Sequence, residues 1–311
     1  MLKVVRGSIG GLAVLIAAVV GVGCRPSADQ SPAVVEAVWL ETGTGPGQTV
    51  YPRAIAFDRE RGWFYVVDRQ GRVQRLDREG KYLSGWVMPN VLLGKPVGMS
   101  ICPDGNLYVA DTHYHRVMVY TPNGAEVRRW GREGNGQGEF VYPTDVAFHG
   151  GRVFVSEYGD HDRVQVFTMA GDFLYEFGRF GAGRGEFSRP QSMVICGDEV
   201  FIADACNHRI QVFGVGGEFR RTLGGVGDGP GRMRFPYGLV ADAGGKLIVT
   251  EFGNNRIQRI DPATGEGLGT WGVGGRGPGE LAFPWSAEVD GVGRVVIVDS
   301  GNNRLLVVRG F

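Results

Sequence analysis

The sequence predicts an all-β protein in which six similar units close into a ring. The first observation is a recurring hairpin, in which two short runs of β-branched and aromatic residues flank a polar turn. The acid that ends the first run occurs six times, as Asp68, Asp111, Glu157, Asp204, Glu251 and Asp299. The arginine that begins the second run occurs in step with it, as Arg72, Arg116, Arg163, Arg209, Arg256 and Arg304. One hairpin is therefore written six times.

A proline ahead of each hairpin sets the period of the repeat. The prolines lie 44, 47, 47, 46 and 48 residues apart, at Pro52, Pro96, Pro143, Pro190, Pro236 and Pro284. Each copy holds four short strands: one after the proline, two in the hairpin and one after a glycine turn. Four antiparallel strands repeated six times predict a six-bladed β-propeller. A linear solenoid is the alternative, but it needs capping repeats with polar outer faces, and none is visible in the sequence.

The two ends of the repeat region are predicted to share one blade. In four copies the last residue of the fourth strand stands 13 positions before the next proline, and Trp39 stands 13 positions before Pro52. The chain ends at Phe311, seven residues after Arg304, so the sixth copy lacks a fourth strand of its own. We expect residues 34–40 to supply that strand and close the ring, which removes exposed sheet edges.

The N-terminal segment is predicted to be an export signal followed by a tether. Lys3 and Arg6 precede an apolar run of 14 residues, 9–22. Such a run is short for a transmembrane helix, and its basic start is typical of a signal peptide. Residues 25–33 offer almost nothing to bury, so they are expected to be a flexible tether. The folded domain is then expected to span 34–311.

The sequence Val22-Gly23-Cys24 resembles the lipobox of bacterial lipoproteins. The resemblance implies that residues 1–23 are removed and that Cys24 carries acyl chains. Those chains would hold the protein on a membrane, because each buried methylene adds about 0.8 kcal/mol. Arg25, where some lipoproteins have aspartate, implies the outer membrane in a cell with two membranes. Ordinary secretion is the alternative.

The composition excludes some partners and explains the abundant glycine. The net charge is zero, both signs are interspersed and no long basic stripe occurs, so a nucleic-acid partner is not predicted. The 53 glycines fall at fixed places in each repeat. Glycine strings such as 134–138 and 181–185 imitate phosphate loops, but those loops need a following helix, and here a strand follows. We interpret them as connections between blades.

Several stretches resemble NHL repeats. They are the run from Asp204 to Phe213, the run from Asn254 to Gln258, and the recurring Gly-Glu-Phe before proline. The resemblance covers about residues 34–311 and implies a six-bladed propeller. It says little about function, because similar blades occur in RNA-binding and scaffold proteins, in receptor-kinase sensor domains and in a zinc-dependent lyase that cleaves hydroxyglycine peptides.

A binding site is expected where the repeat breaks its own symmetry. The residue after each proline varies and is placed at the mouth of the central channel: Arg53, Val97, Thr144, Gln191, Tyr237 and Trp285. Asp145 and Glu288 add acids to innermost strands, where each must meet an arginine, a water or a cation. We therefore predict a ligand-binding mouth formed by Arg53, Asp145, Gln191, Tyr237, Trp285 and Glu288. A cluster of structural waters in the axis is the alternative.

The acid and arginine of every hairpin receive a structural interpretation instead. Because they recur in all copies, we expect the arginine to bridge to the acid or to loop carbonyls across the turn. Each such pair would contribute about 0 to 1 kcal/mol if exposed.

Histidines and cysteines do not predict a metal site or a disulfide. Zinc needs three protein ligands within about 2.0–2.3 Å, and convergence is not expected for the five histidines, His113, His115, His149, His161 and His208. No cofactor is predicted, although the channel acids could accommodate an axial structural cation. Free, buried thiols are expected because the predicted register keeps three cysteines apart, Cys102, Cys196 and Cys206.

These observations predict an exported, membrane-tethered and monomeric propeller that binds a protein or peptide partner at the cell envelope. Tyrosine, tryptophan and arginine at the mouth suit such a contact. The alternative is a metal-dependent lyase resembling the peptidyl-hydroxyglycine amidating or streptogramin-cleaving propellers, with Tyr237 or a mouth acid in proton transfer. A third class, a purely structural ring, predicts no pocket at all.

Overall fold

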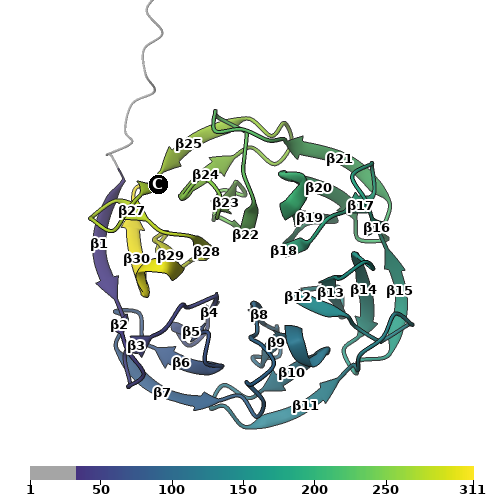
Figure 1. Ribbon diagram of the computed structural model, residues 1–311, viewed down its shortest axis with the longest axis horizontal. Helices are drawn as coiled ribbons and strands as arrows, with labels where there is room; N and C mark the ends of the chain where they lie inside the picture. The colour runs from purple at the N-terminus through teal and green to yellow at the C-terminus, as the bar shows by residue number, and fades with distance from the viewer. Residues whose placement is uncertain (1–32) are drawn as a thin grey trace, which may run out of the picture. The chain divides into compact units, whose positions relative to one another are not determined.

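A computed structural model describes residues 33–311, which form six four-stranded antiparallel sheets around an axis (Figure 1). The predicted six-bladed propeller is therefore confirmed. Blade 1 consists of β4 (Ala54–Asp58), β5 (Trp63–Val67), β6 (Arg72–Leu76) and β7 (Tyr82–Val87). Blade 2 consists of β8 (Gly98–Ile101), β9 (Leu107–Asp111), β10 (Arg116–Tyr120) and β11 (Glu126–Trp130). Blade 3 consists of β12 (Tyr142–His149), β13 (Arg152–Tyr158), β14 (Arg163–Thr168) and β15 (Phe173–Phe177).

Blades 4 to 6 follow the same plan. Blade 4 consists of β18 (Pro190–Cys196), β19 (Glu199–Asp204), β20 (Arg209–Gly214) and β21 (Phe219–Gly224). Blade 5 consists of β22 (Pro236–Ala241), β23 (Leu247–Glu251), β24 (Arg256–Ile260) and β25 (Gly267–Trp271). Blade 6 consists of β28 (Pro284–Val289), β29 (Val295–Asp299), β30 (Arg304–Arg309) and β1 (Val34–Trp39). Short 3₁₀ turns complete three of the hairpins, η1 (Thr112–Tyr114), η2 (Ala205–Asn207) and η3 (Ser300–Asn302). No helix within residues 33–311 is long and apolar enough to cross a bilayer.

The ring is closed by its own N-terminal strand, as the sequence predicts. Strand β1 pairs antiparallel with β30, with Trp39 opposite Leu305 and Val34 opposite Arg309 (Figure 1). The indole of Trp39 is 6% exposed and lies edge-on to the ring of Phe64 in blade 1, with 5.3 Å between centroids. A closed ring excludes the linear solenoid. The predicted signal peptide, Cys24 and most of the tether lie outside the described residues.

The apolar core lies between blades. Each of six clusters combines faces of adjacent blades; one of them joins Tyr65 and Val67 of blade 1 to Val109 and Met118 of blade 2. Because the side chains of a strand alternate between the two faces of its sheet, every blade contributes to two clusters. The axis itself is left to the innermost strands.

The hairpin arginine binds the loop that leads into its own blade. In blade 4, Arg209 Nε lies 2.7 Å from Asp204 Oδ2, and its Nη2 donates to the carbonyl oxygens of Gly183 and Glu186 at 2.7 and 2.8 Å. Gln211 adds a bond to the same loop, because its Oε1 accepts the Gly185 N–H at 3.0 Å. Arg72, Arg163, Arg256 and Arg304 make equivalent bonds. The glycine-rich strings are thus blade connections, as predicted.

The contribution expected from sequence for these acid–arginine pairs applies to the case that they are exposed, but in the structure their acids are buried. All six acids are at most 1% exposed. A buried carboxylate that loses its arginine remains as an uncompensated charge, so these pairs carry a larger penalty for disruption than surface pairs do. Blade 2 departs from the pattern, since Arg116 reaches the side chain of Asn90 in place of loop carbonyls.

Five of the six connections contain a short parallel pairing that fixes their course. Three are two-residue ladders, β2 (Glu41–Thr42) with β3 (Gln48–Thr49), β16 (Arg179–Phe180) with β17 (Glu186–Phe187), and β26 (Val273–Gly274) with β27 (Glu280–Leu281). Two more are single bridges, Glu133 with Phe140 and Val226 with Met233. The connection between β7 and β8 has neither and carries exposed Leu92 and Leu93.

In three blades the side chain of the residue before the hairpin arginine joins neighbouring blades. His208, Asn255 and Asn303 adopt left-handed backbone conformations with φ near 50 to 55°. His208 Nδ1 accepts the N–H of Phe235 at 3.0 Å, as Asn255 Oδ1 accepts that of Phe283 at 2.8 Å. Burial lowers the pKa of His208, which keeps Nδ1 available as an acceptor. Histidine and asparagine therefore do the same structural work here.

Replacing Trp39 by alanine is expected to lower the free energy of unfolding by about 3–5 kcal/mol, because a large buried side chain at the ring closure is lost. Val38 on the same strand is 55% exposed, so Val38→Ala should change it by less than about 0.5 kcal/mol. Urea denaturation measures both. Equal effects of the two substitutions would contradict the closure.

Substituting His208 separates its structural role from metal binding or catalysis. His208→Ala leaves the Phe235 N–H without an acceptor and should cost about 1–2 kcal/mol. His208→Asn restores an acceptor that tolerates positive φ and should stay within about 0.5 kcal/mol of the original protein. Thermal or urea unfolding would reject this role if asparagine and alanine were equally destabilising.

Candidate functional site

The beginnings of the innermost strands gather at one end of the channel. Strands β4, β8, β12, β18, β22 and β28 surround the axis (Figure 1). Because each pairs antiparallel with the next strand of its blade, it begins beside that blade's hairpin turn; Pro190, for instance, lies opposite Asp204. We call this side of the ring the mouth face. We call the side chains that surround the channel opening on it the mouth: Tyr51, Arg53, Tyr158, Arg189, Gln191, Tyr237, Phe252 and Trp285.

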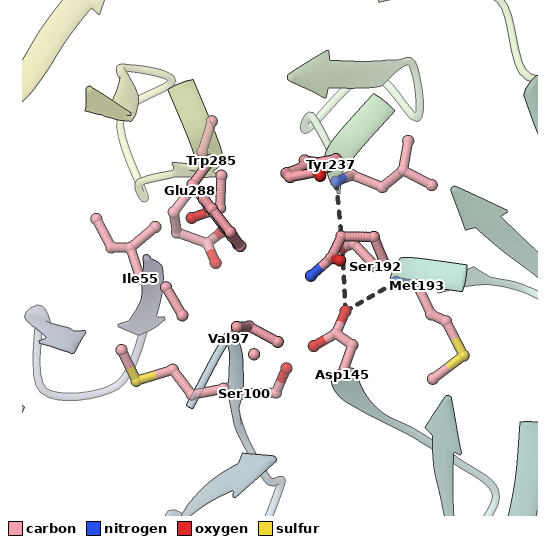
Figure 2. A pocket seen from close by; sticks show the side chains of 16 residues that line it. Ile55, Val97, Ser100, Asp145, Ser192, Met193, Tyr237, Trp285 and Glu288 are labelled. Carbon is pink, nitrogen blue, oxygen red and sulfur yellow. Dashed lines mark hydrogen bonds between the residues drawn. The ribbon is translucent and has the colours of Figure 1, made fainter. Parts of the chain in front are cut away.

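A small cavity lies beneath the mouth (Figure 2). Five of the six predicted site residues line it, namely Asp145, Gln191, Tyr237, Trp285 and Glu288. The volume within the cavity that the centre of a water molecule can occupy is about 70 Å³. One water needs about 10–15 Å³ on that measure, so the cavity holds several waters or a small group and not a large ligand. The existence of this cavity argues against a ring with no pocket.

Arg53 is the sixth predicted residue and stands over the mouth. Its guanidinium carbon lies 4.6 Å from the centroid of the Trp285 ring and 5.7 Å from that of Tyr51. These are cation–π distances. Burial lowers the pKa of Arg53, and the charge of Arg189 lowers it further. Arg189 belongs to the same ring cluster, because its guanidinium carbon lies 5.4 Å from the centroid of Tyr237, which meets Trp285 at 5.0 Å.

Asp145 lies inside the cavity and is bound by the next blade. Its Oδ2 accepts the backbone N–H of Met193 at 2.8 Å and the hydroxyl of Ser192 at 3.0 Å (Figure 2). Its Oδ1 accepts the N–H of Val146 at 2.9 Å. Burial raises the pKa of Asp145 to about 6 despite these bonds. The acid thus links blades 3 and 4 within the channel wall, below the mouth where sequence reasoning had placed it.

Glu288 is the second acid of the cavity. Its Oε1 accepts the N–H of Val289 at 3.0 Å. Burial raises the pKa of Glu288 to about 7, and the charge of Asp145 contributes in the same direction. Two carboxyl groups in one small space disfavour full ionisation of both at neutral pH.

Three donors of the mouth lack an acceptor. Within residues 33–311, Arg53 Nε, Gln191 Nε2 and Trp285 Nε1 are buried and have no hydrogen-bond partner. The Gln191 and Trp285 residues are only 2% and 6% exposed. A buried donor left unpaired costs about 1–3 kcal/mol. The mouth is thus suited to a group that brings acceptor atoms.

Aromatic rings form the wall around these donors. Tyr237 stacks on Phe252 with 4.6 Å between centroids and meets Trp285 edge-on at 5.0 Å. Arg189 lies over the rings of Tyr158 and Tyr237, at 5.0 and 5.4 Å. Such ring contacts hold the side chains in fixed orientations.

Sequence reasoning missed four residues of the mouth. Tyr51 and Arg189 directly precede a proline, and Tyr158 and Phe252 directly follow a hairpin acid. The residue before the proline and the residue after the hairpin acid both vary between the copies, and this variation would have identified them as candidate site residues. Tyr51 and Arg189 have φ of 52° and 62°, a conformation that non-glycine residues rarely adopt, and especially not before proline.

Two further histidines, His113 and His115, have local structural contacts. His113 Nδ1 accepts the N–H of Lys95 at 3.2 Å, and His115 Nδ1 lies 2.5 Å from the carbonyl oxygen of Val141. In the described part of the chain, no three histidine, cysteine, aspartate or glutamate side chains are placed to hold a metal ion.

The three cysteines within residues 33–311 are free, but their predicted burial is partly wrong. Cys102 is buried, Cys196 is half-buried and Cys206 is exposed. Cys206 lies in the turn η2 of blade 4, and a pattern of strand residues does not predict its exposure.

Comparisons with known proteins agree with the architecture. The sequence profile of the NHL repeat matches residues 93–120 and 187–213, which fall in blades 2 and 4. Among solved structures, one described as "Streptogramin B lyase structure" has a TM-score of 0.64 and 14% sequence identity, covering 89% of this chain and 97% of that one. At this identity the likeness shows a shared fold alone.

Replacing Glu288 by glutamine should change the pH dependence of stability. A carboxyl whose pKa is raised on folding releases its proton earlier in the unfolded chain, so the free energy of unfolding falls as the pH rises from about 4.5 to about 7. Glu288→Gln removes this fall and should be more stable than the original protein by about 1–3 kcal/mol at pH 8.

At pH 4 the two proteins should be almost equally stable, because the glutamate is then protonated in both states. Exposed Glu266 provides a control, since Glu266→Gln should show no such pH-dependent gain. Urea unfolding at a series of pH values is the measurement. A stability difference for Glu288→Gln that does not change with pH would show that the carboxyl is not titrating as described.

Proposed function

Because this chain is a six-bladed β-propeller with NHL repeats in blades 2 and 4, we propose that it is a binding module that receives a protein or peptide partner at its mouth. The observation that carries the proposal is the gathering of Trp285, Tyr237 and Arg53 around buried donors that lack acceptors. Tryptophan, tyrosine and arginine are the residues that most often supply the binding energy of protein interfaces.

Apolar side chains extend the mouth outward across the mouth face. Phe235 and Phe283, which directly precede prolines, are 37% and 49% exposed. Leu92 and Leu93 are 95% and 75% exposed, and the N–H of Leu93 donates to the hydroxyl of Tyr114 in a hairpin turn. Exposed apolar groups around a concave polar centre suit a macromolecular contact. The small cavity alone would not suit one.

The proposed export and lipid anchor at Cys24 fit this arrangement. Val34 lies opposite Arg309, at the end of β30 away from its hairpin turn, so the chain enters the ring on the face opposite the mouth. The nine residues 25–33 could span at most about 30 Å. An anchor joined to the propeller on that face would leave the mouth face open to partners in the cell envelope.

The alternative of a metal-dependent lyase has less support. It needs three converging protein ligands, and residues 33–311 offer no such group. Burial raises the pKa of Tyr237, which disfavours a phenolate that would abstract a proton. The streptogramin B lyase structure is similar in fold, and 14% identity carries no activity over to this chain.

A site-specific photo-cross-linker tests the binding face in the native membrane. Placed at Phe283 on the mouth face, it should capture a defined partner. Placed at Val292, which is 59% exposed in the turn between β28 and β29 on the other face, it should not. Immunoblotting and mass spectrometry of the adducts provide the readout. Equal capture at both positions, or capture only at 292, would reject the mouth as the binding face.

A further inference from the structure

We propose that Arg53 and Arg189 form an anion-binding site at the mouth, which holds an oxyanion of the ligand, either a carboxylate or a phosphate. This inference rests on the proposed binding function and names the chemistry that the partner must present. It follows from three features of the mouth: unpaired positive charge, donors without acceptors, and arginines held in place by rings.

The first feature is positive charge without a counter-charge. Within the described chain neither guanidinium has a carboxylate oxygen within 4.0 Å, whereas Arg163 on the same face pairs with Glu157 at 2.7 Å and Glu176 at 2.8 Å. Asp162 contacts Arg189, but it accepts the backbone N–H of that residue and of Gly159. Two half-buried like charges repel each other, and an anion between them relieves that repulsion.

The second feature is that the unpartnered hydrogen-bonding groups of the mouth are all donors. Gln191 Oε1 already accepts from Arg189 Nε at 3.1 Å, so only the amide nitrogen of Gln191 is left, and it is unpartnered. Trp285 Nε1 and Arg53 Nε are also donors without acceptors. The indole and guanidinium nitrogens can only donate, and an amide nitrogen likewise. The missing partner must therefore supply acceptors, as carboxylate and phosphate oxygens do.

The third feature is the fixed position of the two arginines. Arg53 lies over the ring of Trp285 at 4.6 Å, and Arg189 lies within 5.4 Å of the ring centroids of both Tyr158 and Tyr237. Stacking against a ring uses the face of a guanidinium and leaves its N–H edge free to bind an oxyanion. The same rings would contact whatever carries the anion, so an aromatic or apolar neighbour of the charged group is expected.

The acids of the channel do not compensate the arginines. Asp145 and Glu288 lie deeper, on β12 and β28, and Asp145 is bound by the N–H groups of Val146 and Met193. Within the described residues, neither acid has an oxygen within 4.0 Å of a side-chain nitrogen of Arg53 or Arg189. The anion site is therefore confined to the mouth.

Small aromatic probes test this site on the full-length protein in detergent. Benzoate and phenyl phosphate are the anionic probes, benzamide is the neutral one, and ligand-observed NMR measures binding. At least one anion should bind about tenfold more tightly than benzamide. Preference for benzoate would assign a carboxylate, and preference for phenyl phosphate would assign a phosphate.

Charge-removing variants locate the binding. Arg53→Gln and Arg189→Gln should each weaken the anion about tenfold, whereas Arg189→Lys, which keeps the charge, should retain most of the affinity. Arg184→Gln is the matched control, because Arg184 is exposed in a connecting loop of the mouth face. Its affinity should equal that of the original protein. Circular dichroism melting curves check that each variant folds.

Three results would overturn the proposal: benzamide binding as tightly as the anions, anion binding that survives both arginine substitutions in folded protein, or no anion binding at millimolar concentrations. If the probes fail while a cross-linker at Phe283 still captures a partner, the mouth binds that partner without recognising an anion. If the probes bind and no partner is captured, the anion site stands and the proposed protein or peptide partner is wrong.

Discussion

The bond between the hairpin arginine and the loop that enters its blade determines most of this structure. Arg209 joins a fully buried acid, Asp204, to carbonyl oxygens of the loop 181–187. That loop starts at the outer strand of one blade and ends at the inner strand of the next, so a bond to its middle fixes how consecutive blades are oriented. Because the acid is buried, the arginine is needed to compensate its charge. Repeated around the ring, this bond brings β1 to the edge of β30.

The same constraint explains why the asymmetric residues gather at the mouth. In five of the six blades the hairpin arginine is bonded to carbonyl oxygens of the connecting loop, so substitutions at these bonded residues disturb the ring. The innermost strands face the axis, where a side chain can change without displacing a neighbouring sheet. Asp145, Glu288, Gln191 and Trp285 all lie on these strands. The connection between β7 and β8 also departs from the shared pattern, since there Arg116 binds a side chain in place of the loop backbone.

The fold was predictable because its signals are local and repeated. Six acids and six arginines in register specify hairpins, and the position of Trp39 relative to Pro52 specifies the closing strand. The mouth was only partly predictable. Gln191, Tyr237 and Trp285 follow prolines and were found, whereas Arg189 precedes one and was missed, because a left-handed conformation before proline is imposed by neighbouring blades. The partners of Asp145 are on the next blade, 47 and 48 residues away, so its depth could not be read locally.

Polar groups of opposite character are separated along the axis, and this separation limits how a ligand can bind. Hydrogen-bond donors and two arginines occupy the mouth, while two carboxyl groups and a cavity large enough for only a few water molecules lie beneath it. An anionic group that moved deeper would leave Arg53 and approach Asp145 and Glu288, exchanging attraction for repulsion. An apolar group would also have to displace the polar contents of a narrow space. A ligand that satisfies the mouth therefore lies across it, against the exposed rings of the mouth face, and does not enter the channel.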